Sequence, residues 1–310
     1  MDASAFSNTC KKILPEQGAR LFMSKIEQII FEATGSPFNF ASSSSLSGGC
    51  INEASCIEGV DGRYFFLKKN RPSFLSYFEA EAKALTEINH TKTVKTPEAI
   101  GYGLEDGQAF LVLEFIREGS SSSTGQAELG KLLAQMHRIE QPFFGWSMDN
   151  CIGATPQPNT KSDNWVSFYR DHRLAHQFNL AAQKGRKFEG TEKLLTGIDF
   201  FFSSYQPHPS LLHGDLWGGN ASYDANGRPF IFDPATYYGD RETDLAFTYM
   251  FGGFNSSFYD SYNQEYPLDD GFKARKTLYN LYHELNHFNL FGGGYATSAQ
   301  SSIHQLLTHL

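Results

Sequence analysis

The spacing of apolar positions changes along this chain, and each change predicts a different kind of element. Runs of strand-like composition, separated by glycine-containing turns, occupy residues 38–47, 54–57, 63–69 and 109–116. The segment 73–89 instead carries apolar residues at helical spacing, at positions 78, 82, 85 and 88. A shorter helix is predicted over 21–31, after a loose arm at 1–18. Residues 96–107 are predicted to be a connector, because Thr96-Pro97 opens this segment and turn residues follow.

From residue 119 onward, helical spacing dominates. The serine-rich joint 119–125 ends the preceding strand, and 141–162 is expected to be ordered but irregular because it is rich in Pro, Gly, Asn and Thr. Helices are predicted at 126–139, 164–184, 190–204, from 240 onward, 272–289 and 297–309. A strand-rich part of the chain is therefore followed by a longer helical part.

Acidic and amide residues gather around one predicted hairpin in the helical part. Asp215 and Asn220 are five positions apart, the D-x-x-x-x-N spacing of a kinase catalytic loop. Asp233 follows a short apolar run, and a turn at 224–227 would return it towards Asn220. Phosphoryl transfer needs a carboxylate that accepts the hydroxyl proton, and oxygen ligands for the Mg²⁺ on ATP. Asp215 suits the first role, and Asn220 with Asp233 suits the second. For any one of them alone, a solvated loop residue is the alternative.

Upstream residues are candidates for binding ATP. Gly48 and Gly49 lie in a turn whose backbone could approach a phosphate, although a plain hairpin turn fits this stretch as well. Kinases place a phosphate-binding lysine on a strand like 63–69, and alternation leaves Lys68 and Lys69 both open. Glu81 falls inside the apolar arc of the helix 73–89, where a carboxylate needs a partner, and Lys68 is the natural candidate.

The buried strand that ends near residue 116 and the polar joint after it fit a hinge between two lobes. Backbone groups of Glu114, Phe115 and Ile116 could then hydrogen-bond adenine. An ordinary inter-domain linker is the alternative, and it is compatible with the hinge.

Composition narrows the functional classes. The chain has 310 residues, of which 40% are hydrophobic and 19% charged, as expected of a soluble globular protein. A net charge of −8 argues against non-specific nucleic-acid binding. No apolar run approaches the roughly 20 residues of a membrane span, and 1–20 lacks the apolar core of a secretory signal. The cysteines contain no C-x-x-C pair and are expected to be reduced thiols of a cytoplasmic protein; they are Cys10, Cys50, Cys56 and Cys151.

From about residue 48 to 306 the chain resembles the fructosamine-3-kinase (ketosamine-3-kinase) family. The motifs that carry the resemblance are GGCIN at 48–52, FLK at 66–68, FEAEA at 78–82, LHGDLWGGN at 212–220, DPA at 233–235, YYG at 237–239, ETDLA at 242–246 and LNHFNLFG at 285–292. The Asp-Leu-Trp run at 215–217 distinguishes this family from aminoglycoside and choline kinases, which share the His-Gly-Asp pattern.

The resemblance implies an α+β, protein-kinase-like fold of two lobes. We expect an arm and helix over 1–36, an N-lobe with a small antiparallel sheet and one helix over 37–118, and a mainly helical C-lobe over 119–310. The resemblance selects Lys68 as the phosphate ligand. It also implies Trp217 as a wall for the substrate sugar, with packing of the loop as the alternative. His287 is implied as a pocket residue, and a core histidine fits it equally well. Many relatives carry Ser just before Gly219, where this chain has Gly218.

The implied activity is transfer of the γ-phosphoryl group of ATP, with Mg²⁺, to the 3-hydroxyl of a ketosamine that is free or bound to a protein. This reaction would lead to deglycation of amines. The second hypothesis is a kinase that acts on another alcohol, such as an amino sugar or a choline-like compound. The third hypothesis is a nucleotide-binding protein without turnover. It is disfavoured because all of the candidate catalytic residues are present.

The expected partners and assembly follow from the same observations. We expect no nucleic-acid or membrane partner, and a monomer or a redox-sensitive dimer. Cys50 motivates the dimer, because an exposed thiol in the candidate phosphate loop could oxidise to a sulfenic acid or form an intermolecular disulfide, and either product could block ATP. A small residue that fills a turn is the alternative for Cys50.

Overall fold

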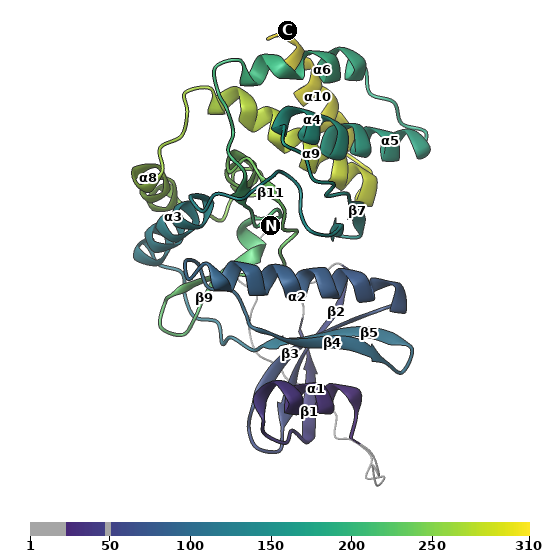
Figure 1. The fold of residues 1–310 in the computed structure, drawn as a ribbon, viewed down its shortest axis with the longest axis vertical. Coiled ribbons are helices and arrows are strands. Elements are labelled where there is room, and N and C mark those ends of the chain that lie inside the picture. The colour runs from purple at the N-terminus through teal and green to yellow at the C-terminus, as the bar shows by residue number, and fades with distance from the viewer. Residues whose placement is uncertain (1–22, 47–50) are drawn as a thin grey trace. The chain divides into compact units, whose positions relative to one another are not determined.

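The computed structural model describes residues 23–46 and 51–310, which form two compact units (Figure 1). The first unit comprises the described part of Met1–Ala82 together with Pro97–Ile116. The second comprises Lys83–Thr96 and Arg117–Leu310. The lobe boundaries 36/37 and 118/119 stay predictions. None of the helices in the described ranges combines the length and the hydropathy that crossing a membrane requires.

A five-stranded antiparallel sheet is the centre of the first unit. Its strands follow the order β1-β2-β3-β5-β4, with bounds Phe40–Ser45 for β1, Glu53–Gly59 for β2, Tyr64–Asn70 for β3, Gln108–Glu114 for β5 and Ala99–Glu105 for β4. Apart from β4, the ends of these strands lie within two residues of the runs predicted from the sequence. In the register of the sheet, Lys68 of β3 stands opposite Leu111 of β5.

The strand β4 shows that the predicted connector over 96–107 is wrong at residues 99–105. The helix α1 (Lys25–Thr34) packs against β4, and two glycines of the strand make room for it. A Cβ on Gly101 would lie 2.4 Å from Cγ2 of Ile29, and one on Gly103 would lie 3.0 Å from the ring of Phe110. These glycines therefore allow close packing inside a strand and do not mark turns.

The second unit is mainly helical. Its α-helices are α3 (Ser123–His137), α4 (Trp165–Tyr169), α5 (His176–Gln183), α6 (Thr191–Gly197), α7 (Glu242–Thr248), α8 (Ser256–Glu265), α9 (Phe272–Phe291) and α10 (Tyr295–Leu307), and the helix α2 (Leu75–His90) belongs to it from Lys83 onward. The π-helix Arg170–Ala175 joins α4 to α5, so the predicted helix 164–184 forms with one irregular turn. The helix α8 was not predicted from the sequence.

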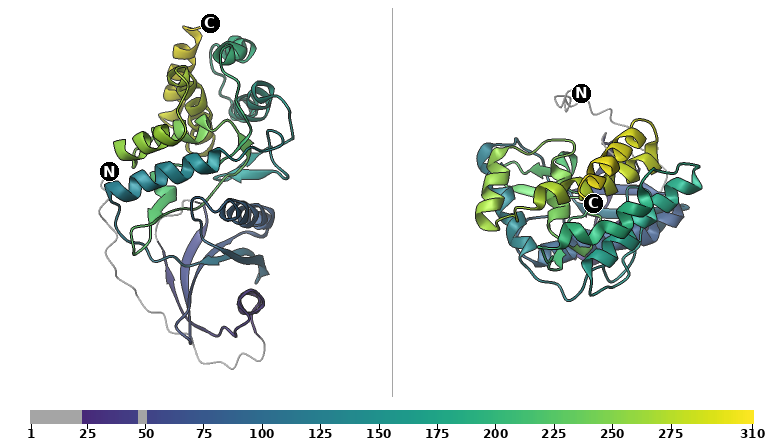
Figure 2. Two further views of the ribbon diagram at one scale, coloured as in Figure 1. Left: turned by 60° about the vertical axis from the view of Figure 1, so that its left-hand side comes forward. Right: turned by 90° about the horizontal axis from the view of Figure 1, so that it is seen from above.

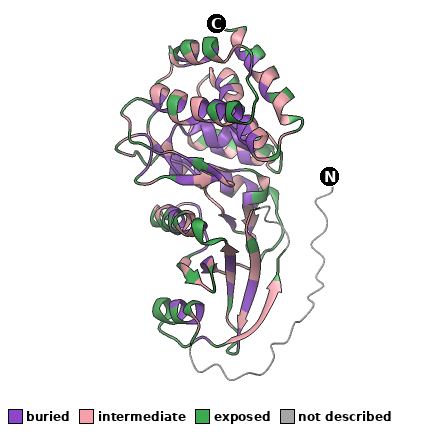
Figure 3. Ribbon diagram, turned by 90° about the vertical axis from the view of Figure 1, so that its right-hand side faces the viewer, coloured by how far each residue is buried: buried purple, intermediate pink, exposed green. Residues whose placement is uncertain are grey.

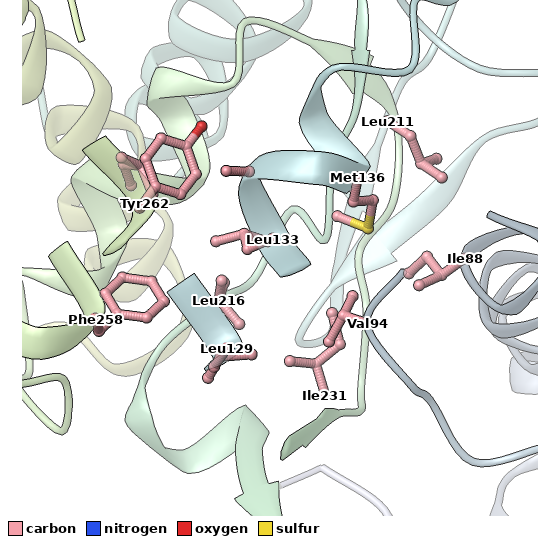
Figure 4. Close-up of a cluster of buried hydrophobic side chains, with 12 residues drawn as sticks. Ile88, Val94, Leu129, Leu133, Met136, Leu211, Leu216, Ile231, Phe258 and Tyr262 are labelled. Carbon is pink, nitrogen blue, oxygen red and sulfur yellow. The ribbon is translucent and has the colours of Figure 1, made fainter. Parts of the chain in front are cut away.

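The helices α3 and α8 run side by side (Figure 2) and close one core of this unit. Leu129, Leu133 and Met136 of α3 belong to the same buried cluster as Phe258 and Tyr262 of α8 (Figure 4). The same cluster contains Leu216 and Ile231, which flank the candidate catalytic residues. Burial in Figure 3 follows this arrangement, since the inner faces of the helices are buried and their outer faces are exposed. The predicted α+β class, with a small antiparallel sheet and a larger helical part, is confirmed.

Short strand pairs position the loops of the second unit. They are β6–β7 (Asn150–Ile152 and Thr155–Gln157), β8–β11 (Ser210–Leu211 and Tyr238–Gly239) and β9–β10 (Ala221–Tyr223 and Pro229–Ile231). The pair β6–β7 lies inside the segment predicted to be irregular. The pair β9–β10 is the hairpin predicted around 224–227.

Candidate active site

The His-Gly-Asp segment lies between β8 and β9, and its glycine is required by the packing of the backbone. Gly214 has a φ of +83°, and a Cβ there would lie 2.1 Å from the backbone oxygen of Ala235. Only glycine fits this position. The segment that follows Asp233 can therefore lie directly against the catalytic loop.

Asp215 and Asn220 contact each other as their spacing predicts. Nδ2 of Asn220 donates to the backbone oxygen of Asp215 at 2.9 Å and to its carboxylate Oδ2 at 3.1 Å. Because these two bonds use both amide hydrogens, the Asn220 oxygen is oriented away from them as an acceptor. Asn220 is buried, and Asp215 is partly buried.

The β9–β10 hairpin returns the chain to this pair, as predicted. The backbone N–H of Phe232 donates to the backbone oxygen of Asn220 at 3.0 Å, and Asp233 follows with a φ of +58°. Such a φ is uncommon for a residue other than glycine, although Asp tolerates it better than most. Burial and, next, the charge of Asp233 raise the pKa of Asp215 well above its usual range.

The donor set fits a Mg²⁺ ion that arrives with a nucleotide. Within the described ranges no three His, Cys, Asp or Glu side chains form a closed metal site. Mg²⁺ does not need one, because it is usually held by one or two carboxylates, phosphate oxygens and water. The carboxylate of Asp233 and the amide oxygen of Asn220 are donors of this kind. A bound cation would also reduce the electrostatic repulsion between the carboxylates of Asp215 and Asp233.

His213 fixes the loop from inside. Its Nε2 donates to the backbone oxygen of Phe232 at 2.9 Å, and its Nδ1 accepts from the backbone N–H of Asp215 at 3.2 Å. These roles require the neutral tautomer with the proton on Nε2. Burial lowers the pKa of His213, which agrees with a neutral ring.

Asp244 of α7 braces the same loop. Its two carboxylate oxygens accept from the backbone N–H groups of His213 at 2.7 Å and Gly214 at 2.8 Å. Nε2 of His137 on α3 lies 3.2 Å from Oδ2 of Asp244. Burial acts to raise the pKa of Asp244, but the bonds from His137 and Gly214 hold it below its usual value. Asp244 is therefore a buried anion that fixes the loop backbone.

Buried amides of the β6–β7 pair hold the segment after Asp233. Nε2 of Gln157 donates to the backbone oxygen of Ala235 at 3.0 Å, and Nδ2 of Asn150 donates to that of Thr236 at 2.8 Å. The hydroxyl of Tyr282 on α9 donates to Oε1 of Gln157 at 2.6 Å. Sequence reasoning missed these supports, because a polar side chain in an irregular segment gives no sign of where it points.

In the first unit, Lys68 and Glu81 form the predicted ion pair. Nζ of Lys68 lies 2.6 Å from Oε1 of Glu81 on α2, and their side chains are 5% and 12% exposed. The neighbouring Lys69 is more exposed. The structure therefore distinguishes two lysines that alternation along β3 could not.

The candidate residues for binding adenine lie at the end of β5 and directly after it. Glu114 is the last residue of β5, and its backbone N–H donates to the backbone oxygen of Glu98 at 2.8 Å. Phe115 and Ile116 follow as partly exposed residues. Gly48, Gly49 and Cys50 lie outside the described residues, so the phosphate-loop and redox hypotheses stay predictions. Of the other cysteines, Cys56 is buried and Cys151 is partly buried.

The two predicted substrate residues come together around a phenylalanine that sequence reasoning did not single out. The rings of Trp217 and Phe251 are 5.9 Å apart, and those of Phe251 and His287 are 5.2 Å apart. Trp217 is 39% exposed, so it is not a core residue. His287 is partly buried, and burial lowers its pKa. The unusual frequency of Phe, 28 residues, was the one sign of such a cluster in the sequence.

Comparisons with known proteins place this chain in a family. The profile of the fructosamine kinase family matches residues 22–309. A probable ketoamine kinase of Synechocystis sp. is 43% identical over 284 residues, which cover 91% of this chain and 96% of that protein. The chloroplastic protein-ribulosamine 3-kinase of Arabidopsis thaliana is 42% identical over 272 residues, 86% of this chain and 82% of that protein.

A solved structure gives the same result. The crystal structure of a candidate fructosamine-3-kinase from Haemophilus somnus matches with a TM-score of 0.85 at 31% identity, and the match covers 91% of this chain and 96% of that one. The resemblance read from the motifs is confirmed, and the chain belongs to the fructosamine kinase family.

Proposed function

We propose that this protein is a Mg²⁺-dependent kinase that transfers the γ-phosphoryl group of ATP to the 3-hydroxyl of a ketoamine, free or attached to a protein. The observation that carries the proposal is the contact of Asp215 with Asn220, next to Asp233, in a chain of the fructosamine kinase family. The names of the relatives, ketoamine kinase and protein-ribulosamine 3-kinase, support the same class of acceptor.

Each candidate residue has a role that its surroundings support. Asp215 accepts the proton of the attacking hydroxyl, and the amide of Asn220 holds its carboxylate in position. Asn220 and Asp233 hold the cation, which supplies charge neutralisation at the phosphates when bound. Lys68, oriented by Glu81, binds phosphate oxygens. Trp217 and His287 contact the ketoamine substrate. Backbone groups of Gly48, Gly49 and 114–116 bind the rest of the nucleotide.

The product explains how such a kinase would remove a glycation adduct. Loss of a proton from carbon 1 of the phosphorylated ketoamine gives a 1,2-enaminol. Its carbon–oxygen bond at carbon 3 is allylic, and phosphate is a better leaving group than hydroxide. Departure of inorganic phosphate and addition of water to the resulting imine release the free amine and a dicarbonyl sugar. We also propose a cytoplasmic location, which the lack of a C-x-x-C pair among the cysteines supports.

An acceptor panel tests this proposal. With Mg²⁺ and ATP, we expect phosphorylation of ribulosyl-lysine or fructosyl-lysine, and much slower or no phosphorylation of kanamycin and choline. Phosphorylated product is measured by mass spectrometry, because ATP consumption alone does not identify the acceptor. Faster phosphorylation of kanamycin or choline than of either ketoamine would instead support a kinase of another alcohol.

A further inference from the structure

An exposed aromatic surface adjoins the catalytic loop. Trp217, Phe251 and Phe291 are 39%, 44% and 56% exposed, and His287 lies among them. Their ring centroids follow one another at 5.9 Å (Trp217 to Phe251), 5.2 Å (Phe251 to His287) and 5.8 Å (His287 to Phe291). We call these four residues the aromatic surface. Exposed apolar side chains that gather in this way mark a binding surface more often than isolated ones do.

Close glycine packing builds this surface. A Cβ on Gly218 would lie 2.8 Å from the backbone oxygen of Gly252 and 3.0 Å from Cα of Gly253. Gly253 has a φ of +98°, and a Cβ there would lie 2.8 Å from Cα of Gly218. The backbone after Phe251 therefore lies against the backbone after Trp217, which brings the two rings together. A side chain at position 218 would therefore meet this backbone and push the two segments apart.

A buried layer beneath keeps the exposed rings in place. Phe247 stacks on His283 with ring centroids 3.6 Å apart, and its edge meets Phe251 at 5.8 Å. Both Phe247 and His283 are buried. Phe251 thus rests on a packed support and presents a ring whose position is defined.

The electrostatics of the aromatic surface favour a cationic ligand. Faces of aromatic rings attract ammonium groups. Elsewhere in the described parts of the chain, several aromatic rings already have a side-chain cation over one face; Nζ of Lys276, for example, lies 4.4 Å from the ring centroid of Tyr249. Among the described residues, no Lys or Arg side chain lies over the ring of Trp217, Phe251 or Phe291 in this way. Burial lowers the pKa of His287, so this ring adds no competing positive charge at neutral pH.

We propose that the aromatic surface binds the protonated secondary amine of the ketoamine and the aliphatic chain attached to it, with the ammonium against Trp217 and Phe251. This inference rests on the proposed function. In a ketoamine, three covalent bonds separate carbon 3 from the nitrogen. Trp217 is two residues from Asp215, so a substrate with its 3-hydroxyl at Asp215 has its amine within reach of this ring. Phe251 then determines specificity for the amine and takes no part in phosphoryl transfer.

The test uses two acceptors that differ in one atom: fructosyl-lysine, and the ether in which oxygen replaces the secondary amine. We expect Phe251→Leu to raise the KM for the amine by about 2- to 30-fold, the range of a cation–π contact, with kcat little changed. The KM for the ether should change much less. Phe251→Tyr, which keeps a ring, should restore the KM, and stepwise fluorination of Phe251 should raise it progressively.

Two further variants sharpen the test. Gly218→Ser should reproduce part of the KM increase of Phe251→Leu, because the added side chain displaces the loop that carries Phe251. Phe200→Leu is the matched control, since Phe200 is 54% exposed and its ring contact is with Phe201. It should change neither KM.

The outcomes separate this inference from the proposed function. If Phe251→Leu raises the KM for amine and ether equally, or leaves both unchanged, the ammonium site is wrong while the kinase assignment stands. If the parent enzyme phosphorylates neither acceptor, the proposed function fails and this inference fails with it.

Discussion

Replacing Asp215 with asparagine is expected to lower kcat by about 10²–10⁴-fold, the usual contribution of a general base. The substituted side chain keeps the shape and an oxygen that can accept from Nδ2 of Asn220, a bond of 3.1 Å in the parent. It cannot take the proton of the 3-hydroxyl. The free energy of unfolding and the Kd for ATP should therefore stay close to the parent values. Steady-state phosphorylation of a ketoamine, calorimetry with ATP and denaturant unfolding measure the three quantities.

Asp171→Asn is the matched control for this experiment. The carboxylate of Asp171 is 52% exposed, pairs with Arg170 at 2.7 Å and is not one of the candidate catalytic residues. Its loss should leave kcat at the parent value. Turnover of Asp215→Asn near that of the parent would remove Asp215 from the proposed mechanism.

The catalytic loop could be predicted from the sequence because the residues that define it lie close together along the chain. The spacing of Asp215 and Asn220 and the turn before Asp233 are properties of one short stretch, and the resulting hydrogen bonds lie within it. The Lys68–Glu81 pair was also predictable, because a carboxylate on the apolar arc of a helix needs a partner. In both cases periodicity or turn chemistry fixes the geometry before tertiary packing is considered.

The features that the sequence missed depend on contacts between distant segments. Gly101 and Gly103 resemble turn residues until Ile29 and Phe110 are seen against them. Gln157 supports the Asp233 segment across 78 positions, the separation of its bond to Ala235. Phe251 is one of many phenylalanines, and only its ring contacts with Trp217 and His287 distinguish it. No local pattern encodes these contacts, because each depends on how remote elements pack.

Asp233→Asn tests the cation site with the least disturbance of the fold. Asp233 has a φ of +58°, and asparagine tolerates this backbone region, whereas alanine would add strain. Asp106→Asn is a matched control, because Asp106 has a φ of +50° and lies in the turn between β4 and β5. Any cost of the substitution in a left-handed conformation is therefore common to both variants.

We expect Asp233→Asn to raise the Mg²⁺ concentration for half-maximal turnover by about 10²-fold or more. Removing a residue that only supports a metal ligand typically costs 10–100-fold in metal affinity, so losing the anionic ligand itself should cost at least as much. The loss of a charge that raises the pKa of Asp215 also lets this carboxyl ionise at lower pH. At saturating Mg²⁺, the acidic limb of the kcat profile should therefore move to lower pH. Mg²⁺ titrations at several pH values measure both effects, and a Mg²⁺ requirement equal to those of the parent and Asp106→Asn would show that Asp233 does not hold the cation.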